Sequence, residues 1–328
     1  MAEGASGIPV VAMGLGHVGQ AIARAALEKA ELRIVGAVDP AHAGRRLEEV
    51  LGSPAPSVIV ARDAAQAFQL AQGGVVLHAT ASEFEVVLPE LEAAVEAGLC
   101  VVSTCEELAW PFHHEGADRL DELCEARDVA VVGVGVNPGF SLDRLPAFLS
   151  QATGPVRHVR AMRVQDAARR RPALQRKVGA GLDEAAFYAA AERGDVGHVG
   201  LSESAMLVAH GCGFELDEVE EEIEAVLAVR DIDAAVPVKA GRVSGLRQVL
   251  RGFADGAERV RLELVIASGT DDERDEVEID AEPPVRAVLR GGLPGELATA
   301  WAVVNAAPAV TMLPGGLATV LDLPSGRL

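Results

Sequence analysis

Three closely spaced glycines place the strongest constraint on the fold. Gly14, Gly16 and Gly19 stand directly after the apolar run IPVVAM (residues 8–13) and at the start of a helical pattern over residues 18–30. In a strand–turn–helix unit, the first glycine permits a tight turn, the second lets the backbone approach a pyrophosphate, and the third allows close helix–strand packing. The first helical turn also offers backbone amides to an anion. The pattern predicts a dinucleotide-binding unit.

The same alternation of apolar runs and helical patterns continues through the first 140 residues. Further apolar runs, separated by helical patterns, occupy residues 32–38, 57–61, 75–80, 100–104 and 129–135. Continuous apolar strands alternating with helices are typical of a parallel sheet covered on both faces. We therefore predict an α/β protein with a Rossmann-type, doubly wound parallel sheet.

The pattern changes after Pro138. Alternating apolar and polar residues predict strands with one solvent-exposed face, and helical patterns lie between these strands. We expect a mixed α+β domain with an open, antiparallel-rich sheet over residues 141–292, serving substrate binding and oligomerisation, and a dinucleotide-binding domain over residues 1–140 with the C-terminal helix region, about 293–328. The acidic run at 269–276 is expected to be a solvated hairpin tip. The expected strands are 156–165, 259–268 and 275–281, and the expected helices are 172–193, 199–211, 217–228 and 293–308.

Asp39 ends the second predicted strand, 20 residues after Gly19. A carboxylate there accepts hydrogen bonds from the adenosine ribose hydroxyls and would repel a 2′-phosphate, which favours NAD over NADP. Arg45 and Arg46 follow in the next loop and could reach a 2′-phosphate, so the predicted cofactor is NAD or NADP. The predicted cofactor-binding residues are Gly14, Gly16, His17, Val18, Gly19, Asp39, Arg45, Thr80 and Asn137.

Composition excludes several other classes of function. The formal net charge is -20 and only 3% of the residues are aromatic, so a nucleic-acid or membrane partner is not expected. The four cysteines form no CxxC pair, and the start of the chain lacks a secretory pattern. We therefore expect reduced thiols and a cytoplasmic location. The histidines show no ligand spacing, and no metal is expected.

Two predicted strands end in side chains that can do chemistry. The run CVVST leads into Glu106 and Glu107, and the last strand of the first domain leads to Asn137. Ligands of a doubly wound sheet bind at the carboxyl ends of its strands. A carboxylate there could hold a cation or transfer protons, although Glu106 and Glu107 could also simply begin the next helix. No lysine lies at this position, which argues against dehydrogenases that depend on a lysine.

The chain resembles the NAD(P)H-dependent amine dehydrogenases similar to 2,4-diaminopentanoate dehydrogenase, which are relatives of dihydrodipicolinate reductase. The matching segments are GLGHVG, VVSTCEELAWP, GVNPGF, RVQDAARRRPALQRKVGAG, GHVGLSES and ATAWAVVNAAP, and they span almost the whole sequence. The resemblance implies reversible reductive amination of a small ketone or aldehyde with ammonia. It also suggests a homodimer formed through the open sheet.

The resemblance further assigns roles to individual residues. It places the catalytic acid/base at Glu106, with Glu107 as the alternative one position along. Asn137, Arg163 and Gln165 correspond to residues that line the substrate pocket. From the residues alone, Arg163 could instead form a structural ion pair with Asp166 or a glutamate.

Two neighbouring features have simpler interpretations. Cys105 lacks an evident partner base, so we expect it to pack rather than react. His113 and His114 are expected on the face of the helix that follows the WPF turn. The alternative functions are a dihydrodipicolinate-reductase-like imine reductase and a non-catalytic NAD-binding sensor.

Overall fold

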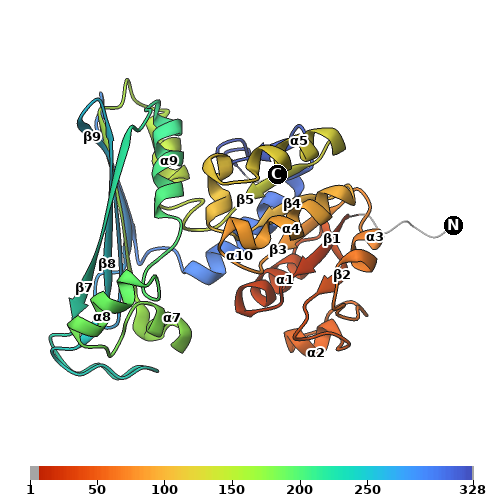
Figure 1. Cartoon of the computed structure of the whole chain (residues 1–328), viewed down its shortest axis with the longest axis horizontal. Helices are drawn as coiled ribbons and strands as arrows, with labels where there is room; N and C mark the ends of the chain where they lie inside the picture. The colour runs from red at the N-terminus through yellow and green to blue at the C-terminus, as the bar shows by residue number, and fades with distance from the viewer. Residues whose placement is uncertain (1–6, 327–328) are drawn as a thin grey trace. The chain divides into compact units, whose positions relative to one another are not determined.

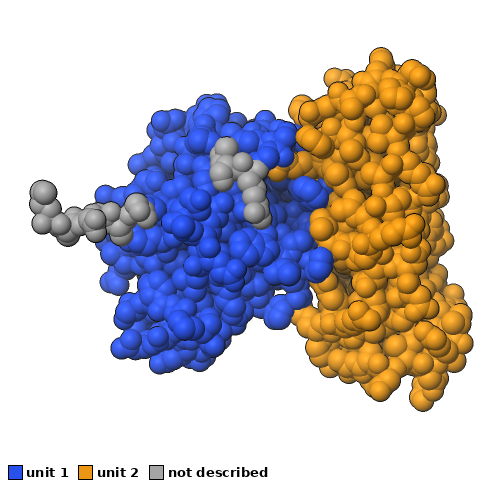
Figure 2. All heavy atoms as spheres, turned by 180° about the vertical axis from the view of Figure 1, so that it is seen from behind, with its two compact units in different colours: residues 1–140, 294–328 blue, residues 141–293 orange. Residues whose placement is uncertain are grey.

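The computed structural model describes residues 7–326, which form two compact units. Unit 1 contains the chain up to Phe140 and again from Pro294, and unit 2 contains Ser141–Leu293 (Figures 1 and 2). The outer ends of the domain ranges expected from the sequence, residues 1 and 328, lie outside the described residues.

Unit 1 is an α/β layer structure whose strands alternate with helices. The apolar runs form strands because both faces of the sheet are covered. Its strands are β1 (Ile8–Met13), β2 (Leu32–Val38), β3 (Val75–His78), β4 (Cys100–Ser103), β5 (Ala130–Gly133) and β12 (Gly316–Ala318). Its helices are α1 (His17–Glu28), α2 (Leu47–Leu51), α3 (Ala65–Leu70), α4 (Phe84–Glu96), α5 (Ala117–Arg127) and α10 (Gly295–Val310), with 3-10 turns η1 (Glu107–Ala109) and η2 (Pro111–His113).

The six strands of unit 1 are all parallel and lie in the order β12-β5-β4-β3-β1-β2. The strand order reverses beside β1, and this is where a doubly wound sheet binds its ligand. The predicted Rossmann-type sheet is therefore confirmed. The strand expected over residues 57–61 does not form, because this segment makes only the isolated bridges Val38–Ala61 and Arg46–Ile59.

The C-terminal segment belongs to unit 1. The helix expected over residues 293–308 is present as α10, and Cys100 of β4 approaches its Val310 carbonyl. The chain then adds β12 to the edge of the sheet beside β5, a strand that the sequence pattern did not indicate.

Unit 2 combines helices with a second sheet. Its helices are α6 (Arg144–Ser150), α7 (Pro172–Lys177), α8 (Glu184–Glu192) and α9 (Leu201–Cys212), with the 3-10 turn η3 (Ala167–Arg169). Its strands are β6 (His158–Asp166), β7 (Glu218–Leu227), β8 (Val243–Ala254), β9 (Ala257–Ala267), β10 (Arg274–Asp280) and β11 (Val285–Arg290).

The second sheet has the order β11-β10-β6-β9-β8-β7 and is antiparallel except between β6 and β9. Figure 1 shows α7, α8 and α9 on one side of β7, β8 and β9. On that side the apolar strand residues, such as Leu250 and Leu262, pack with Leu201 and Val208 of α9. The open, antiparallel-rich sheet expected from the sequence is thus confirmed.

The helix predicted over residues 217–228 is wrong, because this segment forms strand β7. Its glutamates favour a helix in isolation. In the fold they lie opposite arginines of β8, and Glu224 pairs with Arg247 at 2.7 Å while Glu220 and Glu222 pair with Arg251. Cross-strand ion pairs and backbone pairing with β8 override the local helix propensity.

Two further expectations need correction. The helix expected over residues 172–193 is split into α7 and α8 where Gly179 and Gly181 adopt φ of +80° and +87°, a conformation that ends a helix. The acidic run at 269–276 is not a hairpin tip, because β6 lies between β9 and β10 in the sheet. Its Asp275 and Glu276 are buried in ion pairs rather than solvated.

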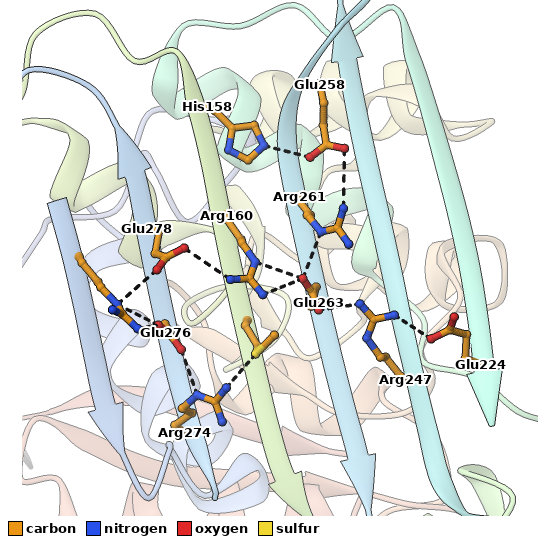
Figure 3. Close-up of polar contacts among 12 residues, drawn as sticks. His158, Arg160, Glu224, Arg247, Glu258, Arg261, Glu263, Arg274, Glu276 and Glu278 are labelled. Carbon is orange, nitrogen blue, oxygen red and sulfur yellow. Dashed lines mark hydrogen bonds and ion pairs between the residues drawn. The ribbon is translucent and has the colours of Figure 1, made fainter. Parts of the chain in front are cut away.

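The other side of the second sheet, called the outer face below, carries a network of charged side chains (Figure 3). Glu263 is 3% exposed and accepts hydrogen bonds from Arg160, Arg247 and Arg261 at 2.9–3.1 Å. Burial alone would raise the pKa of Glu263, but these three arginine contacts lower it.

None of the helices within residues 7–326 combines the length and apolar character needed to cross a bilayer.

Candidate active site

A cavity of about 570 Å³ opens in unit 1 at the carboxyl ends of β1, β2 and β3. This volume is within the range of small-molecule and cofactor sites. The residues that line it come from the strand ends, the glycine-rich turn, the loop before α3, α3 itself and one side of α4: Met13, Gly14, Gly16, Val38, Asp39, Pro40, Arg62, Asp63, Ala64, Phe68, Ala79, Thr80, Pro89, Glu90 and Ala93.

The glycines of the first turn fit the roles that their spacing predicts. Gly14 has φ of +80°, and a Cβ there would lie 2.4 Å from the Ala79 carbonyl oxygen. A Cβ on Gly19 would lie 1.7 Å from the Gly14 oxygen, so only glycine lets α1 pack this closely on the turn. A Cβ on Gly16 would point into open space, which leaves this backbone accessible to a ligand.

Asp39 ends β2, is 9% exposed and lines the cavity. Its Oδ2 accepts a 2.7 Å hydrogen bond from the Leu15 amide, and its Oδ1 accepts from the amides of Ala41 and His42. The carboxylate therefore joins the glycine-rich turn to the loop after β2. A carboxylate offers about four acceptor positions, so one remains for a further donor.

The structure does not bring Arg45 to this cavity. Its guanidinium contacts His42 Nδ1 and the Glu49 carbonyl at the surface. Arg62 lies in the cavity wall instead and is the one cation among the described lining residues. Sequence reasoning missed it, although its position directly after the apolar run 57–61 was an available signal.

The other predicted cofactor residues have distinct surroundings. His17 begins α1 and contacts Glu296 of α10 at 2.7 Å, and Val18 follows it in the first turn of α1. Thr80 follows β3 and lines the cavity. Asn137 follows β5 and is half-buried, and the neighbouring Val136 amide donates to Thr299 of α10.

The turn after β4 carries both predicted catalytic carboxylates. Glu107 Oε2 accepts a 2.6 Å hydrogen bond from the Phe84 amide, at the first residue of α4. The Cys105 thiol and the Glu107 amide both donate to the Ser82 carbonyl, at 3.0 and 3.3 Å. These contacts fix the turn on either side of Glu106, which is half-buried. The Glu107 side chain thus serves the start of α4.

Cys105 is 1% exposed, and burial raises the pKa of its thiol to about 12. A thiol in this state is a weak nucleophile, which fits the expected packing role. His113 and His114 precede α5 rather than lying on a helix face: His113 ends η2, and His114 stacks on Phe84 with ring centroids 5.4 Å apart.

Arg163 and Gln165 belong to β6 in unit 2. Arg163 is 1% exposed, and its Nη1 donates to Asp275 at 2.5 Å and to Ser141 at 2.9 Å. Burial lowers the pKa of this guanidinium, and the Asp275 carboxylate opposes the shift. Arg163 Nη2 and Gln165 Nε2 both donate to the Leu293 carbonyl. The ion pair therefore forms with Asp275, and not with Asp166 or a glutamate.

A buried polar cluster adjoins the cavity and was also missed. His78 ends β3, is 1% exposed, and contacts Ser103 Oγ at 2.8 Å and Glu90 Oε2 at 2.9 Å. Thr80 Oγ1 donates to the same Glu90 oxygen at 2.6 Å. A histidine inside an apolar strand was a usable signal, whereas Glu90 lies on a helix pattern with nothing to distinguish it.

Comparison with known proteins identifies relatives along the whole chain. The 2,4-diaminopentanoate dehydrogenase of Acetoanaerobium sticklandii is 28% identical over 340 residues, which cover 98% of this chain and 94% of that protein. The 4-hydroxy-tetrahydrodipicolinate reductase of Moorella thermoacetica is 32% identical over 133 residues, or 40% of this chain and 46% of that protein.

A solved structure shares the fold. The amine dehydrogenase of Mycobacterium smegmatis superposes with a TM-score of 0.85 at 22% identity, covering 98% of both chains. In addition, a family profile described as the 2,4-diaminopentanoate dehydrogenase C-terminal domain matches residues 140–327, more than half of the chain. The resemblance seen in the sequence motifs is confirmed, and the protein is an oxidoreductase. The chain belongs to the 2,4-diaminopentanoate dehydrogenase family.

Proposed function

We propose that the protein is an NAD(P)H-dependent amine dehydrogenase that converts a small ketone or aldehyde and ammonia reversibly to an amine. The observation that carries this proposal is the turn after β4. Glu107 there is hydrogen-bonded to the start of α4, and the family resemblance assigns the acid/base to Glu106, which is its neighbour in the same turn. The turn belongs to the same unit as the cavity with the dinucleotide-binding glycines.

One carboxylate meets the needs of this reaction. Ammonium must lose a proton before it can attack a carbonyl, the resulting carbinolamine must lose water, and the iminium that forms is positively charged. The Glu106 carboxylate would take the proton from ammonium, return it to the departing hydroxyl, and then stabilise the iminium by its charge. A lysine at this position would repel the iminium.

The cavity in unit 1 suits a nicotinamide dinucleotide, which supplies the hydride when bound. Gly16 leaves backbone exposed where a pyrophosphate would lie, and Asp39 keeps an acceptor position for a ribose hydroxyl. Asp39, Asp63 and Glu90 give the wall three carboxylates against the single guanidinium of Arg62. This balance disfavours an added 2′-phosphate, and we propose a preference for NADH over NADPH.

The substrate residues remain part of the proposal. We keep Asn137 and Gln165 as substrate-binding residues, since each is half-buried and carries an amide that can donate or accept. For Arg163 we favour the structural alternative, because its guanidinium is already bonded to Asp275, Ser141 and the Leu293 carbonyl. A substrate carboxylate would have to compete with Asp275 for it.

The proposal is tested by mixing the protein with NADH, ammonium chloride and a panel of small ketones and aldehydes at alkaline pH. Absorbance at the NADH band is followed with and without ammonium. Ammonium-dependent oxidation of NADH with at least one carbonyl compound is expected, together with formation of the matching amine. No ammonium-dependent oxidation with any of them would contradict the proposal.

The partial match to a 4-hydroxy-tetrahydrodipicolinate reductase makes imine reduction the second candidate. Such an enzyme would reduce a preformed cyclic imine without added ammonium. The same assay therefore includes one cyclic imine, and turnover of this compound alone, independent of ammonium, would favour the second candidate. An NAD-binding sensor would bind the cofactor without either activity.

We also propose that two copies pair through the outer face of the second sheet. This face carries carboxylates and guanidinium groups in alternation and neutralises them within the chain (Figure 3). Charges that are already paired cost less to bury than isolated ones. In a two-fold dimer each copy presents the same face to the other, so this face, which carries charges of both signs, packs against an identical face.

The pairing is tested by sedimentation. One chain has a mass of 34.1 kDa, and the expected species has twice that mass. Val265→Glu adds a charge to β9 between the ion pairs and is expected to give a monomer, whereas Tyr188→Glu on the exposed part of α8 is expected to stay dimeric. A wild-type monomer at micromolar concentration would contradict the pairing.

A further inference from the structure

A chain of hydrogen bonds runs from the cofactor cavity to the turn that carries Glu106. At the turn, the Cys105 amide donates to Ser103 Oγ at 3.0 Å. Ser103 contacts His78 Nδ1 at 2.8 Å, and His78 Nε2 contacts Glu90 Oε2 at 2.9 Å. Glu90 is in the cavity wall. At its other end, this chain of hydrogen bonds thus reaches Cys105, the residue directly before the proposed acid/base.

The donors of this chain can all point toward Glu90. Ser103 Oγ already accepts from the Cys105 amide, so its own hydrogen is available to His78 Nδ1. His78 then carries its hydrogen on Nε2 and donates to Glu90, which also accepts from Thr80. Burial alone would raise the pKa of Glu90, but the hydrogen bonds from His78 and Thr80 lower it. An ionised carboxylate at the end polarises the whole chain.

The chain of hydrogen bonds is rigid because two of its members lie within the sheet of unit 1. His78 and Ser103 are paired across β3 and β4 at the carboxyl ends of these strands. His78 is 1% and Ser103 0% exposed, and the Thr104 amide donates to the His78 carbonyl at 3.0 Å. Ser103, His78 and Glu90 resemble a nucleophile triad, but a fully buried hydroxyl cannot reach a substrate. The remaining role for these three side chains is to hold the turn after β4 in place.

We propose that Ser103, His78 and Glu90 are positioning residues that hold the Glu106 turn in register with the cofactor cavity. This inference rests on the proposed function, because it assumes that Glu106 is the acid/base. A misplacement of about 1 Å can cost a factor of about 100 in rate. Loss of Ser103 should therefore lower kcat and leave cofactor binding intact, because Ser103 does not line the cavity.

The first test compares Ser103→Ala with Ser244→Ala. Both serines are buried, and Ser244 makes one hydrogen bond to the Val226 carbonyl in unit 2, so both variants lose stability. We expect Ser103→Ala to lower kcat for ammonium-dependent NADH oxidation by about tenfold or more, with the Kd for NADH within about twofold of wild type. Ser244→Ala should keep the wild-type kcat.

The second test keeps the inference falsifiable if Ser103→Ala does not fold. Glu90→Gln retains an oxygen that can accept from His78 and Thr80, whereas Glu90→Leu does not. Because Glu90→Gln keeps an acceptor but loses the charge, we expect it to lower kcat less than Glu90→Leu, which should lose about tenfold. Equal kcat for Glu90→Leu and wild type, or a wild-type kcat in folded Ser103→Ala, would overturn the inference.

The two proposals fail in different ways. If Glu106→Gln keeps full activity, the proposed role of Glu106 is wrong and the positioning role falls with it. If Glu106→Gln is inactive while Ser103→Ala and Glu90→Leu turn over normally, only the positioning role is overturned.

Discussion

Glu107 Oε2 accepts a hydrogen bond of 2.6 Å from the backbone amide of Phe84, which is one of the unpaired amides at the start of α4. Removing such an acceptor from a helix start costs about 1 kcal/mol. We predict that Glu107→Ala lowers the free energy of unfolding by about that amount, while Glu107→Gln, which keeps a carbonyl oxygen, loses less. Urea unfolding measures both. A wild-type urea midpoint for Glu107→Ala would contradict this role.

The buried pair of Arg163 and Asp275 gives a larger effect on stability. Asp275→Ala leaves the guanidinium buried opposite Ser141 without its carboxylate, and an uncompensated buried charge costs about 3–5 kcal/mol. Arg157→Ala removes an exposed partner of Asp280 and should cost much less, because water screens an exposed ion pair. If unfolding in urea shows similar losses for the two variants, the pair is not the structural element described above.

Stability at alkaline pH reports on Cys105. Its folded-state pKa of about 12 lies above the ordinary thiol value of 9.0, so the native state holds the thiol proton more tightly than the unfolded chain does. The resulting stabilisation is complete below pH 9 and is lost as the pH rises through 12. We predict that stability falls less steeply above pH 9 in Cys105→Ala than in wild type. Parallel curves would show that the thiol is not protected.

Cofactor preference depends on Asp39 and Arg62. Asp39→Asn removes the negative charge beside the ribose site and keeps one acceptor oxygen, so the affinity for NADPH relative to NADH should rise about tenfold, or about 1.4 kcal/mol. Arg62→Ala should shift the ratio in the opposite direction. Titration of each protein with NADH and with NADPH gives the ratios, and an unchanged ratio in both variants would refute the assignment.

The sequence predicts features whose signal is local. Gly14, Gly16 and Gly19 are fixed by steric contacts within one turn, so their spacing alone indicates the strand–turn–helix unit. The apolar runs that become β1 to β5 likewise need no distant partner to be recognised. Asp39 was found for the same reason, since it lies at a fixed interval after the glycines.

Features that depend on distant partners escaped prediction. The glutamate-rich segment 218–227 becomes a strand only because arginines of β8 lie opposite. Arg62 enters the cavity through a loop whose course the local sequence does not specify. Glu90 matters because His78, 12 residues earlier, lies beneath it. In each case the partner is set by the tertiary fold, which no short sequence pattern encodes.

The most direct measurement of the central claim compares Glu106→Gln with Glu107→Gln in ammonium-dependent oxidation of NADH. The matched pair removes one carboxylate at a time from the same turn. We predict that Glu106→Gln lowers kcat by a factor of about 100 to 10,000 with an unchanged Kd for NADH, while Glu107→Gln stays within about tenfold of wild type. Wild-type turnover by Glu106→Gln, with or without a loss in Glu107→Gln, would contradict the account.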